Sequence, residues 1–391
     1  IKAIVDADPA RRFVVVSACG RRFKGDTKVT DLLYLVNAHV KYHVSCEELL
    51  EDIGQRYFDI ADELELTYPI REEFAAFAER ARSGGYSTEE LVSRGEYFTS
   101  RLMADYLGFP FVDATDVVCI NFDGTFNFNE TTERLKEILK KHDRFVMPGF
   151  YGRLPDGHVR VMSRGGSDIS GSILARCIQA DLYENWTDVS GFLMADPRIV
   201  ENPRNIEQIT FSELRELSYM GASVLHEDAI FPVRKEGIPI NIRNTNKPED
   251  PGTLIVENTC RKPKYTITGI AGKTGFCSVT IEKAMMNSEI GFGRKVLGVF
   301  EDCGISFEHM PSGIDTMTIF VHQSEFEQHE QFVISNIHRA VQPDSIELES
   351  DLALIAVVGR GMKSTRGTAG RIFSALAHSR INVKMIDQGS S

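Results

Sequence analysis

Up to about residue 256 the chain alternates short apolar runs with longer segments of helical spacing. The run RRFVVVSACG at 11–20 is continuous and ends in small residues, which is typical of a buried parallel strand. Further strands are predicted within 117–122, 144–152 and 180–186, and amphipathic helices within 25–83, 84–108 and 169–180. Alternating strands and helices build βαβ units, so this region is predicted to be an α/β domain with a mostly parallel sheet sandwiched by helices.

Past residue 264 the pattern changes to an internal repeat of about seventy residues. The segments 265–284 and 351–370 each begin with a strand followed by a glycine-containing loop. Each is followed by a helix, at 293–304 and 369–380, and by a strand, at 305–313 and 381–389. The repeat predicts two ferredoxin-like α+β modules within 264–391, with the second cut short, after a first domain that spans 1–258.

The composition argues against several classes of function. With 391 residues, two or three domains are expected. A net charge of −12 argues against a nucleic-acid-binding surface, although it leaves room for a small anionic ligand. No apolar run approaches the roughly 20 residues that cross a bilayer, so no membrane partner is expected. Seven scattered cysteines without a Cys-x-x-Cys pair indicate reduced thiols in the cytoplasm, and no metal site of the Cys/His type is predicted.

One candidate ligand site is Ser163-Arg164-Gly165-Gly166-Ser167-Asp168. The two glycines let the backbone approach a ligand closely, and Ser167 or Asp168 can cap the helix that follows. Arg164 offers a planar fork suited to a carboxylate or a phosphate. Taken alone, the segment is equally consistent with a helix-capping turn that carries a surface arginine.

Other candidate ligand-binding motifs are informative only when they are taken together. Thr187-Asp188 follows a predicted strand, at the carboxyl end where open α/β sheets bind ligands. Asp196-Pro197-Arg198 lies in a turn, and Gly95-Glu96 and Thr30-Asp31 lie at predicted helix starts. Each of these also has a structural explanation, as a turn, a cap or a carboxylate placed at a helix dipole.

The ordered series is more specific than any single motif. The chain shows, in order, VVVSA, TDLL, RGEYFTS, PGFYG, RGGSD, TDVSGFLMADPRIV, ELSYMGASVLHEDAI, IPINIRNT and PGTLI. The series closely resembles the aspartate kinase family over essentially the whole chain. The resemblance implies an amino-acid-kinase fold followed by tandem ACT modules. It also implies ATP- and Mg²⁺-dependent phosphorylation of the L-aspartate β-carboxylate, in lysine, threonine and methionine biosynthesis.

The resemblance also implies residue roles. Arg164 would clamp the substrate α-carboxylate with Gly165, Gly166, Ser167 and Asp168 beside it, and Arg164 and Asp168 are the catalytic candidates. Glu96 would contact the α-amino group, and Thr30 would lie near the substrate. The ATP-site candidates are Ser17, Thr187, Asp188, Leu193, Arg198 and Ser223. No general base is expected, because the acceptor carboxylate is already ionised at neutral pH.

Three departures from the family pattern qualify these roles. The family's N-terminal strand and Lys-Phe-Gly-Gly loop are expected upstream of Ile1. Leu193 stands where the family commonly has tyrosine, and Ser223 where it usually has lysine. The alternatives are therefore a kinase for a related acidic amino acid or a non-catalytic amino-acid sensor. Fusion to homoserine dehydrogenase beyond residue 391 also stays open.

The C-terminal modules are the expected regulators. In the resembling family, ACT modules bind end-product amino acids at interfaces between modules, so lysine, threonine or both are the expected effectors. Such pairing implies a homodimer or homotetramer. Glu308 is suited to a cationic group, with a solvated strand residue as the alternative, and for Met286 and Phe292 the alternative to effector binding is core packing. The effector candidates are Met286, Gly291, Phe292, Ser306, Glu308 and Ser312.

Overall fold

The computed structural model describes residues 1–162, 165–221, 227–259 and 264–387. The chain folds into two compact units. Unit 1 comprises Ile1–Phe192, Asn205–Phe211 and Val224–Thr259, and unit 2 comprises Leu193–Arg204, Ser212–Ser223 and Cys260–Ser391. Two segments that precede residue 224 in the chain therefore fold with the C-terminal region. No helix in the described ranges is long and apolar enough to cross a membrane.

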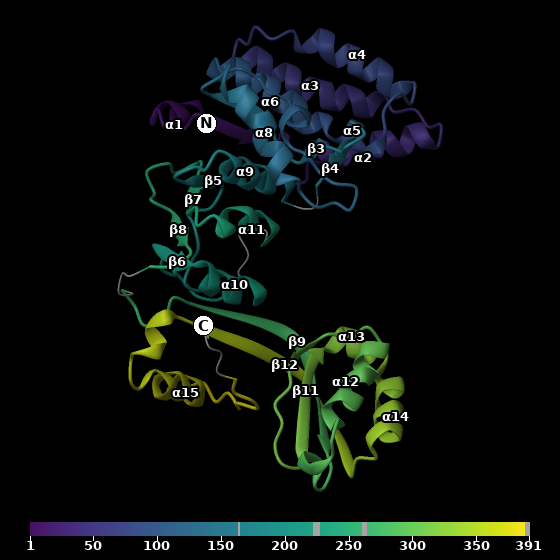
Figure 1. The fold of residues 1–391 in the computed structure, drawn as a ribbon, viewed down its shortest axis with the longest axis vertical. Helices are drawn as coiled ribbons and strands as arrows, with labels where there is room; N and C mark the ends of the chain where they lie inside the picture. Colours follow the sequence, from purple (N-terminus) through teal and green to yellow (C-terminus); the bar gives the residue numbers. More distant parts are fainter. Residues whose placement is uncertain (163–164, 222–226, 260–263, 388–391) are drawn as a thin grey trace. The chain divides into compact units, whose positions relative to one another are not determined.

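The helices of unit 1 pack around a buried aromatic cluster. The cluster contains Tyr57, Phe74, Phe77 and Phe98. The ring centroids of neighbouring members are 5.3–6.4 Å apart. These residues come from α3 (Glu47–Glu63), α4 (Ile70–Arg82) and α6 (Arg94–Leu107), which lie together in Figure 1. The helices are α1 (Lys2–Asp6), α2 (Val29–Lys41), α3 (Glu47–Glu63), α4 (Ile70–Arg82), α5 (Thr88–Val92), α6 (Arg94–Leu107), α7 (Ala114–Val117), α8 (Phe128–Leu139), α9 (Gly166–Cys177) and α11 (Glu227–Lys235).

The strands of unit 1 form separate sheets. The strands β1 (Phe13–Val16) and β2 (Phe145–Pro148) pair in parallel, as the apolar run at 11–20 predicts. A four-stranded sheet has the order β5 (Tyr183–Thr187), β7 (Ile240–Asn244), β8 (Thr253–Val256), β6 (Gln208–Thr210). Its β5–β7 and β6–β8 pairs are parallel, and β7–β8 is antiparallel. The predicted α/β class is confirmed.

One predicted strand is wrong. Residues 117–122 form only isolated bridges, Cys119 to Arg153 and Ile120 to Phe126. The short helix α7 covers the start of the segment because the Asp113 side chain accepts a hydrogen bond from the Thr115 amide and caps it. The neighbouring hairpin consists of β3 (Tyr151–Arg153) and β4 (Val159–Val161).

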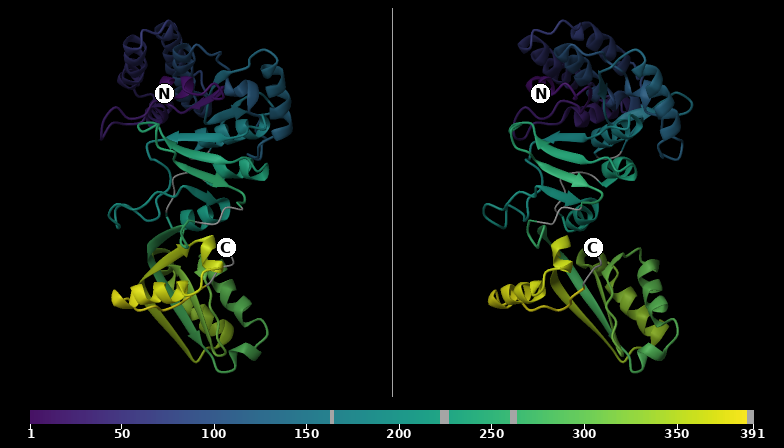
Figure 2. Two further views of the ribbon diagram at one scale, coloured as in Figure 1. Left: turned by 90° about the vertical axis from the view of Figure 1, so that its left-hand side faces the viewer. Right: turned by 60° about the vertical axis from the view of Figure 1, so that its left-hand side comes forward.

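Unit 2 contains a ferredoxin-like module. Its antiparallel sheet has the order β10 (Phe307–His309), β11 (Thr316–His322), β9 (Gly269–Glu282), β12 (Ser345–Val358). The helices α12 (Phe292–Asp302) and α14 (Glu330–Val341) cover one face of this sheet (Figures 1 and 2) and bury its core. Also in this unit are α10 (Phe211–Tyr219, from Ser212 onward), η1 (Met286–Ser288), α13 (Gln323–Glu327), η2 (Arg360–Lys363) and α15 (Thr368–His378).

Both repeats form differently from the prediction. The glycine-containing loop expected within 265–284 of the first repeat is absent from 269–282, since β9 continues through Gly272 and Gly275. It continues because the second half of β12, from Leu352 to Val358, pairs with Gly269–Phe276. Helix α15 forms as expected, but described residues 381–387 contain no strand.

Candidate active site

Three elements meet closely at Gly149. The amide of Gly149 donates a 3.0 Å hydrogen bond to the carbonyl oxygen of Val16, the last residue of β1. A Cβ atom at Gly149 would lie 2.7 Å from the backbone and side chain of Ser167, so only glycine fits here. Ser17 follows β1, and Ser167 lies in the first turn of α9. The fold therefore brings these two predicted residues to the same corner.

Helix α9 begins differently from the prediction that Ser167 or Asp168 caps it. Its N-cap is Gly165 with φ of +76°, and no side chain caps the helix. Gly166 comes next, where a Cβ atom would lie 2.7 Å from the Phe150 ring. This tight packing, which a side chain at the first helical position would disturb, favours glycine at the helix start. Arg164 lies outside the described residues.

Asp168 is held by two residues that sequence reasoning missed. The side-chain amide of Asn185 donates a 2.8 Å hydrogen bond to the Asp168 carboxylate. The Tyr183 hydroxyl donates a 3.0 Å hydrogen bond to the Asp168 carbonyl oxygen, and burial raises the pKa of Tyr183. Both residues lie on β5 with Thr187, at alternate positions that share one face. That alternation before the Thr187-Asp188 motif is the sequence signal that could have indicated them.

A cleft of about 1340 Å³ extends through unit 1. Ser17, Ser167 and Asp168 line it, whereas Thr30 and Glu96 do not. Its walls include residues 13–16 of β1 and 183–186 of β5. In the described part of the chain β1 pairs with β2 and β5 pairs with β7, so each strand has a second edge without a strand partner.

Glu96 lies in the first turn of α6, as its helix-start position predicts. Its side chain is buried, and among the described residues its Oε2 atom has no hydrogen-bond partner. Burial raises the pKa of this carboxyl group to about 7. The preceding Gly95 packs against Ala18 and Val29, since a Cβ atom there would lie 3.1 and 3.5 Å from them. The half-buried Thr30 follows Val29 in the first turn of α2, so Thr30 and Glu96 lie on two helix starts that pack together.

A charged network borders the cleft. Arg56 is buried and donates hydrogen bonds to Asp26 (3.0 Å) and Asp52 (2.7 Å). Arg22 also bonds both carboxylates, and its hydrogen bonds hold the pKa of Asp26 well below the usual range. Arg22 and Arg56 both line the cleft. This network fixes the 20–28 loop between β1 and α2.

The ATP-site candidates divide between the units. Thr187 ends β5 as predicted, its carbonyl oxygen accepts a 2.8 Å hydrogen bond from Thr245, and its hydroxyl lies 3.3 Å from the Asp188 carboxylate. Leu193 and Arg198 belong to unit 2. The Arg198 side chain is exposed and bonds Asp196, whose pKa it lowers to about 2. Ser223 lies outside the described residues.

The effector candidates are spread over the ferredoxin-like module. Glu308 lies opposite Val321 and Phe320 of β11, whereas Ser312 pairs with Met317 near the other end of that strand. Met286 and Phe292 are buried in the core of the module. Gly291 has φ of +80° and is the N-cap of α12. Ser306 and Ser312 are exposed, whereas the Glu308 side chain is 8% exposed. Backbone and polar groups, rather than Met286 and Phe292, are therefore the accessible ones.

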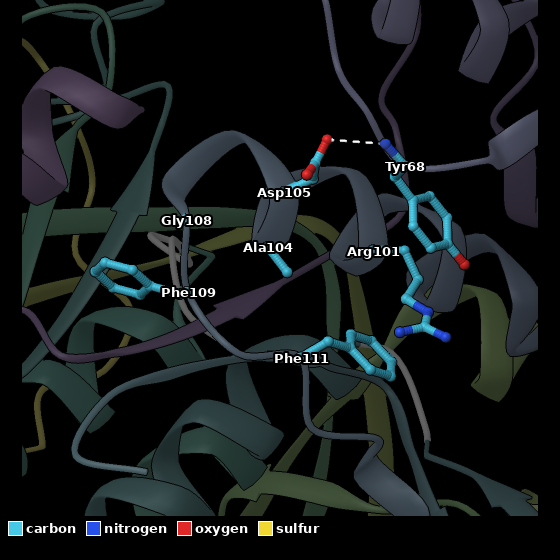
Figure 3. Close-up of a pocket in the computed structure, with 7 residues that line it drawn as sticks. All are labelled: Tyr68, Arg101, Ala104, Asp105, Gly108, Phe109 and Phe111. Carbon is cyan, nitrogen blue, oxygen red and sulfur yellow. Dashed lines mark hydrogen bonds between the residues drawn. The ribbon is translucent and has the colours of Figure 1, made fainter.

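A smaller pocket of about 250 Å³ lies at the C-terminal end of α6 (Figure 3). Arg101 lies over the rings of Tyr68 and Phe111, with its guanidinium carbon 5.0 and 4.4 Å from the ring centroids. Asp105 accepts hydrogen bonds from the Thr67 and Tyr68 amides. None of the predicted site residues lines this pocket, and its Arg101 and Asp105 side chains already bond Tyr97 and Thr67 outside the lining.

No group of three or more His, Cys, Asp or Glu side chains that could hold a metal ion occurs within the described ranges. Mg²⁺ in phosphoryl-transfer sites is commonly held by one or two carboxylates together with substrate phosphates. Asp168, at the cleft, is a carboxylate of this kind. The residues therefore fit an ion that arrives with the nucleotide.

Comparison with known proteins defines the class. Residues 1–244 match the model of the amino acid kinase family, and residues 355–391 match an ACT domain. "Aspartokinase 3" of Bacillus subtilis is 41% identical over 406 residues, which cover 99% of this chain and 88% of that protein. The crystal structure of Clostridium acetobutylicum aspartate kinase matches with a TM-score of 0.93 at 48% identity, covering 100% of this chain and 90% of the other.

The E. coli aspartokinase III structures match with a TM-score of 0.70 at 25% identity and cover 100% of this chain. One contains lysine and aspartate in a T-state and covers 89% of that chain, and the other contains aspartate and ADP in an R-state and covers 90%. The chain under study belongs to the amino acid kinase family and, within that family, to the aspartate kinases.

Proposed function

We propose that this chain transfers the γ-phosphoryl group of ATP to the β-carboxylate of L-aspartate, with 4-phospho-L-aspartate and ADP as products. Membership of the aspartate kinases supports the reaction. The observation that carries it is Glu96, a buried carboxylate with an oxygen that has no partner among the described residues. Burying an unpaired charge is costly, and a substrate ammonium group would compensate that cost.

The substrate's two α-carbon charges require one anion and one cation. Glu96 would bind the ammonium group, and Arg164 the α-carboxylate, with Thr30, Gly165, Gly166 and Ser167 beside the substrate. Asp168 would lie near the reacting groups, oriented by its hydrogen bond from Asn185. The acceptor carboxylate is ionised at neutral pH, so these residues act by positioning and no protein base is required.

ATP binding is proposed for Ser17, Thr187, Asp188, Leu193, Arg198 and Ser223. The related E. coli enzyme binds ADP together with aspartate, which supports a nucleotide site of this kind. When bound, Mg²⁺ would neutralise phosphate charge, with Asp168 as its protein carboxylate. Serine at 223 provides no positive charge, so other cations would have to contact the phosphates.

Regulation by an amino acid is proposed for the ACT region. The related E. coli enzyme binds lysine in its T-state, which supports lysine as effector, and threonine is the alternative ligand. Gly291, Ser306, Glu308 and Ser312 would contact it, and Met286 and Phe292 would shape the site from the core. A homodimer or homotetramer formed through the ACT modules is proposed with it. A cytoplasmic location fits the six described cysteines, which are free thiols.

The decisive experiment is trapping the acyl phosphate. Hydroxylamine added to the protein with ATP, Mg²⁺ and L-aspartate should yield aspartyl hydroxamate, and added lysine should suppress it. L-glutamate in place of aspartate tests the related substrate. Tight lysine binding without any hydroxamate would reject the kinase proposal and favour an amino-acid sensor of the same fold.

A further inference from the structure

We propose that Tyr219 is a regulatory positioning residue whose hydroxyl competes with the ammonium group of an amino-acid effector for the Glu308 carboxylate. The inference rests on the proposed effector site and adds a competitor from a different part of the chain. Tyr219 ends helix α10, and Glu308 lies on β10, both within unit 2. The two residues are 89 positions apart in sequence.

The contact itself is short and asymmetric. The Tyr219 hydroxyl donates a 2.5 Å hydrogen bond to Glu308 Oε2. The Glu308 side chain is only 8% exposed, whereas Tyr219 is 57% exposed. A carboxylate with little exposed side chain is stabilised by a hydrogen-bond donor, while an exposed phenol can return to water at small cost. Replacing the Tyr219 hydroxyl by another donor therefore costs less free energy than leaving the Glu308 carboxylate without any donor.

A β-bulge directs Glu308 to this position. Phe307 pairs with Val321 and His309 with Phe320, so Glu308 is the extra residue between two consecutive partners. Bulges turn a side chain away from the regular alternation of a strand. The strand is thus shaped to present this carboxylate.

Two other polar groups are close to Glu308. His322 Nε2 lies 3.4 Å from Glu308 Oε1, and Lys273 Nζ lies 3.3 Å from the same ring nitrogen. The imidazole stacks on Phe276 with centroids 4.6 Å apart, which holds it in place. Because Lys273 and Glu308 share one ring nitrogen, His322 cannot donate to Glu308 while it accepts from Lys273. Tyr219 is therefore the well-placed donor, and an incoming ammonium group would replace it.

Helix α10 is fastened to the same module at its other end. Its buried Glu213 accepts hydrogen bonds from the Thr268 hydroxyl (2.6 Å) and the Arg360 amide (3.1 Å). Leu217 packs directly on Gly269, where a Cβ atom would lie 2.8 Å away. Thr268 directly precedes β9, Gly269 begins it, and Arg360 follows β12. Helix α10 is thus attached to the sheet through Glu213 and Leu217, independently of Tyr219.

Displacing Tyr219 would release only the end of α10 beyond Leu217, because Glu213 and Leu217 keep the rest of the helix attached to the sheet. The exchange of donors at Glu308 is therefore confined to this end of the helix.

The test uses the two partners because they have opposite predicted effects. Tyr219→Phe removes the competitor, so the lysine Kd, measured by calorimetry on the full chain, should fall about fivefold. Glu308→Gln removes the carboxylate, so the lysine Kd should rise about tenfold or more. In the Glu308→Gln background, Tyr219→Phe should have no further effect. Tyr42→Phe, at an exposed tyrosine of unit 1, is the matched control.

The outcomes separate this inference from the proposed function. Shifts of both variants in the same direction would indicate a merely structural pair and overturn the competition. An unchanged Kd for Tyr219→Phe would also overturn it, even where Glu308→Gln does not fold. Failure of the wild-type chain to bind lysine or threonine would reject the effector site and this inference with it. Failure of catalysis alone would not affect the binding test.

Discussion

The side-chain amide of Asn185 on β5 donates a 2.8 Å hydrogen bond to the carboxylate of Asp168 on α9. This bond connects the proposed aspartate segment with the strand that ends at the proposed nucleotide residue Thr187. Asn185 is buried, so water does not readily replace it. Asn185 is therefore a fixed donor that helps to orient the Asp168 carboxylate.

Replacing that donor should slow the reaction. Asn185→Leu keeps the side-chain size and removes the amide, so kcat should fall about tenfold, the equivalent of one hydrogen bond to a charged group. Steady-state kinetics in the hydroxamate assay measure the change. Asn336→Leu, on the exposed surface of α14, is the control. A wild-type kcat in Asn185→Leu would show that Asp168 does not depend on Asn185.

Glu96 should make aspartate use pH-dependent. Only its ionised form attracts an ammonium group, and burial raises its pKa to about 7. The kcat/KM for aspartate should therefore rise with pH up to about 7 and then level off. Glu96→Gln should remove this titration and raise the aspartate KM about tenfold or more. An identical pH profile in the variant would exclude Glu96 as the titrating group.

The same carboxyl group should affect stability. Its pKa in the folded protein lies above its ordinary value of 4.5, so the folded state retains the proton over that interval. The free energy of unfolding therefore decreases as pH rises from about 4.5 to about 7, by about 3 kcal/mol from this group. Urea unfolding of ligand-free protein should show Glu96→Gln gaining stability relative to wild type across this interval. A constant difference between the two proteins would contradict the shift.

Replacing Arg164 should raise the KM for aspartate and leave the KM for ATP nearly unchanged. Arg164→Ala removes the proposed partner of the α-carboxylate, so the aspartate KM should rise about tenfold or more while the ATP KM stays within about twofold. Separate titrations of each substrate measure this. Arg160→Ala, which breaks a partly exposed ion pair with Glu89, should change neither constant. An unchanged aspartate KM in Arg164→Ala would remove this residue from the site.

The Arg56 network should support the fold at the cleft. Arg56→Leu would leave Asp26 buried without one of its two cationic partners, at a cost of about 3 kcal/mol. Arg71→Leu breaks an exposed pair with Asp62 and should cost less than about 1 kcal/mol. Denaturant unfolding of both variants measures the difference. Equal losses would indicate that burial adds nothing to the Arg56 pair.

Local sequence patterns predicted the elements that depend on local forces. The apolar run at 11–20 predicted β1, and the amphipathic periodicity predicted helices such as α6 and α15. The ordered motifs placed Glu96 in the first turn of α6 and Thr187 at the end of β5. These features follow from residue spacing, because burial of one face is decided within each element.

Only the tertiary structure decided how these elements combine. The glycine-containing loop predicted within 265–284 became part of β9 because the second half of β12, about 80 residues away, pairs with it. The expected cap at Ser167 or Asp168 gave way to Gly165, because Phe150 packs on the start of α9. Asn185, Tyr183 and Tyr219 acquired their partners through contacts between separate elements. Hydrogen-bond partners and strand pairing depend on which distant segments become neighbours, and residue spacing along one segment does not contain that information.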